Sequence, residues 1–81
     1  MTEPTEPTVD LTVDAKDQKC PMPVLLTSRA AKQLAPGQVL LVEATDRGSL
    51  RDIPSWAGDT GNTLLESSSH EGVFRYLIRK G

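Results

Sequence analysis

The segment from Val39 to Ala44, which reads VLLVEA, is the feature that most constrains the fold. It is an apolar run of strand length, and such runs are typical of strands buried inside a sheet. A second strand is expected from residues 9 to 15, where VDLTVDA alternates apolar and polar side chains. Because a helical pattern from Pro21 to Leu34 separates the two strands, we expect a right-handed βαβ unit with parallel strands.

The stretch SLRDIPSWAGDTGN predicts a second helix. Ser49 and Asp52 resemble a capping box, which would place the start of the helix at Ser49. Pro54 would then fall in the second turn, where its missing N–H is costly, so a start nearer Asp52 stays open. One face of this helix would carry Leu50, Ile53 and Ala57.

The chain ends in two further strand patterns, TLLES from residue 63 and VFRYLIRK from Val73 to Lys80. The intervening SSHEG reads as a short loop, which favours an antiparallel hairpin. The order βαβαββ predicts a two-layer α/β (α+β) sandwich, with a four-stranded mixed sheet and two helices on one face. We expect a single domain over residues 9–81, preceded at residues 1–8 by a disordered acidic tail that repeats Thr-Glu-Pro.

Composition excludes several classes of function. Cys20 is the only cysteine, so the chain can form neither an internal disulfide nor a zinc site built from several thiolates. A net charge of −2 argues against broad nucleic-acid binding, which leaves direct tRNA binding a distant alternative. No apolar run approaches membrane-spanning length and no signal peptide is evident, so we expect a cytoplasmic protein without membrane contact, cofactor or metal.

The segment CPMP places the single thiol immediately before two prolines. Proline is tolerated in the first turn of a helix, where backbone N–H groups have no intrahelical partner. If Cys20 is the N-cap, Pro21 and Pro23 occupy the first turn and the N–H of Met22 remains to meet the sulfur. The positive end of the helix would then lower the pKa of Cys20. A buried, inert cysteine is the alternative, but the polar residues before it favour an exposed and reactive thiol.

The residues that are absent narrow the chemistry of such a thiol. A hydrolase-type cysteine needs a histidine base, and we expect the only histidine, His70, to be a solvated loop residue. A redox-active dithiol needs a second cysteine. The thiol can still accept a sulfur atom, hold it as a persulfide and pass it on.

A surface beside the thiol is a candidate docking site. On the helix after Cys20, Leu25 falls on the polar face between Arg29 and Lys32, and Met22 projects near the same side. These four residues could form a patch for a partner protein. Single exposed hydrophobic residues are also common without function, and this alternative stays open.

Four further segments form a recognisable set: CPMPVLL at 20–26, PGQVLLV at 36–42, RDIPSW at 51–56 and YLIRKG at the C-terminus. Together they resemble the TusA family of sulfur-carrier proteins, also called SirA-like. The similarity runs from about Val9 to Gly81, and it implies a βαβαββ two-layer sandwich. It also implies that Cys20 carries the persulfide and that Pro21 and Pro23 belong to the family motif.

The resemblance implies a sulfurtransferase in the carrier sense, with little turnover alone. A cysteine desulfurase or a rhodanese would load Cys20, and a DsrE-like or other protein would accept the sulfur for tRNA 2-thiolation, molybdenum-cofactor synthesis or sulfur oxidation. Arg51, Asp52 and Pro54 match a second family segment on the side of the cysteine, where Arg51 and Asp52 could assist docking or serve only as a capping pair. We expect a monomer when free. The alternative function is a non-catalytic regulatory or interaction module in which Cys20 is only a helix cap.

Overall fold

The computed structural model describes residues 9–81, so the acidic tail predicted for residues 1–8 lies outside the described residues. The predicted element order is confirmed. No helix among the described residues is both long and apolar enough to cross a lipid bilayer. The elements are β1 (Leu11–Ala15), α1 (Met22–Ala31), β2 (Val39–Ala44), α2 (Ser49–Asp59), β3 (Thr63–His70) and β4 (Val73–Arg79).

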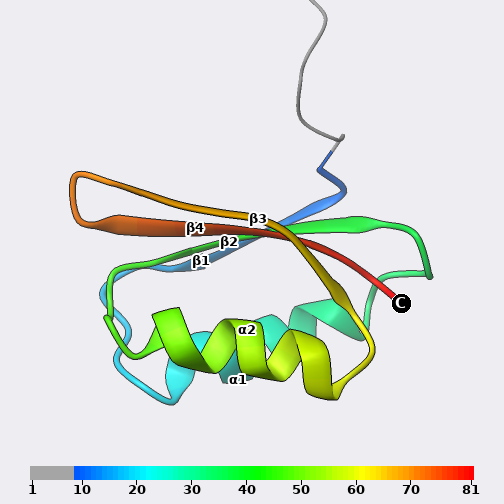
Figure 1. Ribbon diagram of the computed structural model, residues 1–81, viewed down its shortest axis with the longest axis horizontal. Coiled ribbons are helices and arrows are strands. Elements are labelled where there is room, and N and C mark those ends of the chain that lie inside the picture. The colour runs from blue at the N-terminus through cyan, green and yellow to red at the C-terminus, as the bar shows by residue number, and fades with distance from the viewer. Residues whose placement is uncertain (1–8) are drawn as a thin grey trace, which may run out of the picture.

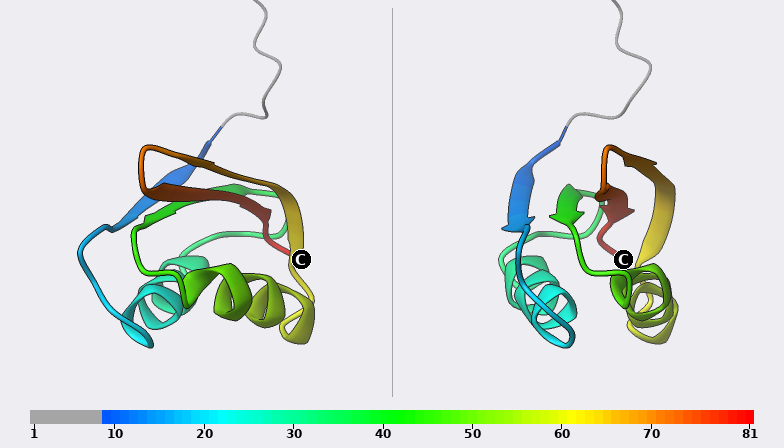
Figure 2. Two further views of the ribbon diagram at one scale, coloured as in Figure 1. Left: turned by 60° about the vertical axis from the view of Figure 1, so that its left-hand side comes forward. Right: turned by 90° about the vertical axis from the view of Figure 1, so that its left-hand side faces the viewer.

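The four strands form one mixed sheet in the order β1-β2-β4-β3. β1 and β2 are parallel, as expected for a βαβ unit, while β4 is antiparallel to both β2 and β3. Both helices lie on the same face of the sheet (Figure 1), and the end-on view separates the two layers (Figure 2). The predicted two-layer α/β sandwich is therefore confirmed.

The hydrophobic core lies between the sheet and the helices. Alternate residues of the central strands β2 and β4 point toward the helices, as the two-residue period of a strand requires. The buried side chains of α1 are small, and they include Ala30 and Ala31. The core includes Val13, Ala15, Ala30, Ala31, Leu40, Val42, Ala44, Ile53, Tyr76 and Ile78.

The final hairpin is longer than predicted. β3 extends through His70, so the segment predicted to be a loop, residues 68–72, contributes three residues to the strand. The turn consists of Glu71 and Gly72 alone, whose φ angles are 50° and 82°. Two positive φ values in a two-residue turn match the right-handed twist of a hairpin, and the backbone pairing with β4 continues to the turn. The predicted loop was wrong because residues 67–69 have polar side chains, which are untypical of a strand, although their backbone pairs with β4 at the edge of the sheet.

The second helix begins at Ser49, which settles the alternative that the sequence left open. The predicted capping box is wrong, because α2 has no side-chain cap and Ser49 Oγ instead donates to the Asp46 carbonyl oxygen at 2.8 Å. Pro54 lies inside the helix. The expected helical face is only partly correct: Ile53 and Ala57 are buried, whereas Leu50 is 48% exposed.

Candidate functional site

Two loops bring the candidate site together at one edge of the sheet. Because β1 and β2 are parallel, the loops that follow them leave the same edge, and each leads into a helix (Figure 1). In open α/β sheets, this carboxyl edge is where ligand sites usually form. The first loop carries Cys20, whose side chain is exposed, and the second carries Asp46 and Gly48.

The entry into α1 differs from the sequence-based prediction. The N-cap is Pro21 and the first helical residue is Met22, so Cys20 lies one position outside the cap. The N–H of Met22 donates to the Lys19 carbonyl oxygen at 2.8 Å and is therefore not the partner of the sulfur. This bond closes a four-residue turn whose third residue, Pro21, follows a cis peptide bond, an arrangement typical of one class of β-turn. Cys20 is therefore not the N-cap that the sequence predicted.

A carboxylate of α2 contacts the thiol directly. Cys20 Sγ donates a hydrogen bond to Asp52 Oδ2 at 3.0 Å, although the two residues are 32 positions apart. The backbone N–H of Cys20 donates to Asp46 Oδ2 at 3.3 Å, and the same oxygen accepts the N–H of Gly48 at 3.0 Å. Side chains from the β2–α2 region thus hold both the backbone and the sulfur of Cys20.

These carboxylates raise the pKa of the Cys20 thiol. The hydrogen bond to Asp52 is the largest cause, and partial desolvation and the negative charges of Asp52 and Asp46 act in the same direction. The positive charge of Arg51 opposes them. The lowered pKa predicted from the helix terminus is therefore wrong, because a carboxylate that accepts the S–H bond stabilises the protonated thiol.

Gly48 leaves the space in which this arrangement fits. A Cβ atom at this position would lie 2.7 Å from Asp46 Oδ2 and 3.3 Å from Cys20 Cβ. It would also lie 3.7 Å from Cys20 Sγ. Sequence reasoning missed both Asp46 and Gly48, although an aspartate that binds a backbone N–H two residues later is a recognised turn pattern.

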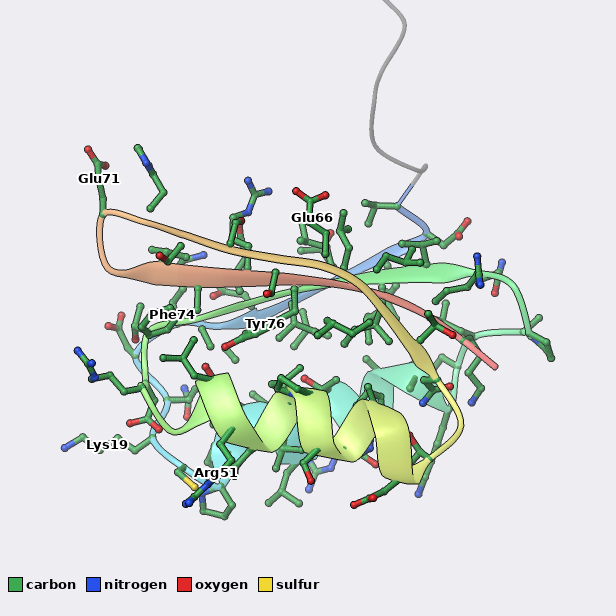
Figure 3. The ribbon with its side chains drawn as sticks, viewed as in Figure 1. Lys19, Arg51, Glu66, Glu71, Phe74 and Tyr76 are labelled. Carbon is green, nitrogen blue, oxygen red and sulfur yellow. The ribbon has the colours of Figure 1, made fainter. Side chains whose placement is uncertain are left out.

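The candidate docking residues lie on the exposed surface of the two helices. Leu25 is 45% exposed, as its out-of-phase position on α1 predicts, and Arg29, Lys32 and Arg51 are exposed as well. None of these three cations forms an ion pair within residues 9–81. Arg51 extends from the start of α2 at the end of the molecule where Lys19 precedes α1 (Figure 3).

The remaining predicted residues occupy less exposed or more distant positions. Pro23 is buried in the first turn of α1, and Met22 and Pro54 are half-buried. His70 ends β3, and its Nε2 lies 3.8 Å from Glu71 Oε1. Within the described part of the chain, no histidine is hydrogen-bonded to Cys20, and no cluster of His, Cys, Asp and Glu could hold a metal ion.

Comparisons with known proteins agree on one family. Residues 11–80 match the family described as sulfurtransferase TusA. The chain is 42% identical over 71 residues to the sulfur carrier protein TusA of Allochromatium vinosum, a match that covers 88% of this chain and 93% of that protein. It is 39% identical over 72 residues to YrkI of Bacillus subtilis, covering 89% of this chain and 96% of YrkI.

A solved structure extends the likeness to the fold. The SirA-like protein of Desulfitobacterium hafniense superposes with a TM-score of 0.78 at 29% sequence identity. The match covers 88% of this chain and 97% of that structure.

Proposed function

The chain belongs to the sulfurtransferase TusA family, and we propose that it carries sulfur as a persulfide on Cys20. The observation that carries this proposal is an exposed single thiol held at the carboxyl edge of β1 and β2. With no second cysteine in the chain, a sulfur bound to Cys20 cannot be released by an internal disulfide. The sulfur must pass to another molecule, as the role of a carrier requires.

The proposed loading step is an exchange of one sulfur–sulfur bond for another. The Cys20 thiolate attacks the outer sulfur of a donor cysteine persulfide, and a bond forms between these two sulfurs. The sulfur–sulfur bond of the donor breaks, and its electron pair leaves with the donor cysteine as a thiolate. The proton that Cys20 loses balances the one that the donor thiolate gains, so no net oxidation occurs. In the delivery step, a thiolate of the acceptor attacks the outer sulfur of the Cys20 persulfide, and Cys20 leaves as the thiolate.

Donor and acceptor are proposed from the family. A cysteine desulfurase or a rhodanese supplies the sulfur, and a DsrE-like or other sulfur-accepting protein receives it in the cytoplasm. The destination is 2-thiouridine in tRNA, molybdenum-cofactor synthesis or the oxidation of reduced sulfur. In this proposal the carrier is a monomer when free and binds neither nucleic acid nor membrane.

We propose that the docking surface runs along the exposed side of α1 and onto the start of α2, beside the thiol. Leu25 supplies an exposed apolar contact there. Arg29, Lys32 and Arg51 are exposed, form no ion pair within residues 9–81, and can meet acidic groups of a partner. Asp52, which the sequence placed in this set, also contacts the sulfur itself. The proposed docking residues are Met22, Leu25, Arg29, Lys32, Arg51 and Asp52.

The test is intact mass spectrometry after incubation with a cysteine desulfurase and cysteine, or with a rhodanese and a sulfur donor. We expect the mass of one sulfur atom to be added to the wild-type chain and removed again by a reductant. Cys20→Ser is the control and should remain unmodified under the same conditions. A wild-type chain that stays unmodified with several donors of both classes would contradict the proposal.

A further inference from the structure

We infer that Asp52 controls when Cys20 can react. In the free carrier, its carboxylate accepts the S–H hydrogen bond and keeps the unloaded cysteine as a neutral thiol. When the sulfur donor docks, a cationic group of the donor binds this carboxylate, and the thiol can then lose its proton. The inference rests on the proposed carrier function for the identity of the donor. It adds the chemical nature of the donor surface, which must present a lysine or arginine beside its persulfide.

The first argument is geometric. The S–H group of Cys20 points at Asp52 Oδ2, 3.0 Å away, and Asp52 forms no ion pair within the described residues. Its negative charge is therefore available to the thiol. Asp52 lies in the first turn of α2, whose start is fixed by the buried contact of Ser49 with Tyr76. The carboxylate is thus presented from a rigid element.

The charges around the sulfur support the same conclusion. Asp46 approaches from the β2–α2 loop and acts on the thiol in the same direction as Asp52, while Arg51 on α2 acts against them. The first turn of α1 contains no acidic residue, and its only basic residue in the last turn, Arg29, lies at the far end of that helix. Lys19 extends outward from the loop (Figure 3). Two carboxylates thus dominate, and they favour the uncharged thiol.

The chemical consequence is that the free carrier is a poor nucleophile. The thiolate, and not the thiol, attacks a persulfide. Asp52 cannot remove the proton itself, because a carboxylate is a far weaker base than a thiolate. Loading therefore requires that the carboxylate change partner.

A cation on the donor provides that change. When a lysine or arginine of the donor binds Asp52, the carboxylate no longer accepts the S–H bond, and the added positive charge stabilises the thiolate. The released proton passes to solvent and is balanced by the proton that the donor cysteine takes up when it leaves. Two neighbouring carboxylates, Asp46 and Asp52, make the edge of the site complementary to such a basic contact.

The hold on the thiol is tested by the rate at which iodoacetamide alkylates Cys20 as a function of pH. Asp52→Asn keeps the shape of the side chain, and Asp59→Asn is the matched control, because it removes the same charge from the other end of α2. We expect Asp52→Asn to react about tenfold faster than wild type at neutral pH, with its profile shifted to lower pH. Asp59→Asn should overlay wild type. An unchanged Asp52→Asn profile, or an equal shift in both variants, overturns the inference.

The donor dependence is tested with a second reaction. Glutathione persulfide, a small and anionic donor without a basic surface, should load wild type slowly and Asp52→Asn faster. A protein donor that loads wild type should gain little from the substitution. If Asp52→Asn slows loading from glutathione persulfide, Asp52 is a base and the inference is wrong. If no donor of either kind loads Cys20 while the alkylation profile still shifts, the carrier function and the donor-triggered release both fail, and only the hold of Asp52 on the thiol stands.

Discussion

The hydroxyl of Ser49, the first residue of α2, lies 2.8 Å from the hydroxyl of Tyr76 in β4. Both residues are about 1% exposed, so this hydrogen bond joins the helix that carries Asp52 to a central strand of the sheet. A buried hydroxyl without a partner is costly, whereas removal of both partners leaves nothing unsatisfied. The contact therefore fixes where α2 begins relative to the sheet.

Ser49→Ala should lower the free energy of unfolding by about 1–3 kcal/mol, because it leaves the Tyr76 hydroxyl without its partner. Urea denaturation measures this loss. In the double variant Ser49→Ala/Tyr76→Phe the loss should be smaller than the sum of the two single losses. Strict additivity of the two substitutions would show that the hydroxyls do not act as a pair.

Gly48→Ala should destabilise the protein and disturb the thiol. The added Cβ lies within 2.7 Å of Asp46 Oδ2, so the carboxylate must leave its bonds to the backbone of Cys20 and Gly48. We expect a net loss of about 1 kcal/mol in the free energy of unfolding, because these two N–H groups lose their acceptor.

Gly58→Ala is the matched control, since it lies in α2 and an added Cβ there meets nothing within 4 Å. This substitution should raise the free energy of unfolding by about 0.4–1 kcal/mol through the entropy of the unfolded chain. The opposite order of stabilities would contradict the role assigned to Gly48.

Stability should fall at alkaline pH in two steps. The Asp52 hydrogen bond raises the pKa of Cys20, and burial raises the pKa of Tyr76 against the opposing bond from Ser49. A folded state that keeps a proton to higher pH is fully stabilised below the ordinary pKa of the group, and this contribution is lost as the pH rises through the folded-state pKa.

Urea denaturation between about pH 7 and pH 11 should therefore show a decline that starts near the cysteine range and continues through the tyrosine range. Cys20→Ser should remove the lower part of the decline. Tyr76→Phe should reduce the upper part, to which Lys16 also contributes because its bonds to Glu43 and Asp14 raise its pKa. A flat profile in the wild type would mean that neither proton is held more tightly after folding.

Leu25→Ala tests the docking surface. Leu25 is exposed on α1, so its truncation should change the free energy of unfolding by no more than about 0.5 kcal/mol. Sulfur transfer from a protein donor should nevertheless become several-fold slower, because an apolar contact is lost. Leu65→Ala, a substitution of another exposed leucine on β3, should leave the transfer rate unchanged. Equal rates for all three proteins would remove Leu25 from the docking surface.

The fold was readable from the sequence because hydrophobic periodicity reports directly on strands and helices. The apolar run of β2 and the amphipathic pattern of α1 define the βαβ unit without further information. The length of β3 was not readable, because its pairing with β4 overrides the polar character of residues 67–70.

The chemistry of the site was only half readable. The position of the thiol beside a helix start followed from the segment CPMP. The raised pKa of Cys20 did not follow, because its causes, Asp52 and Asp46, lie 32 and 26 residues away in the chain. From the local sequence only the effect of the nearby helix terminus on the pKa can be predicted. The carboxylates, whose effect on the pKa is larger, approach the thiol only in the folded structure.

One oxygen atom, Oδ2 of Asp46, accepts the backbone N–H groups of both Cys20 and Gly48. The loops after β1 and β2 are therefore linked through this one carboxylate oxygen. A movement of either loop at that point would weaken the hydrogen bond to the other loop. A protein that presses against either loop acts on both at once. A partner that binds at the start of α2 would therefore also affect the position of the Cys20 sulfur.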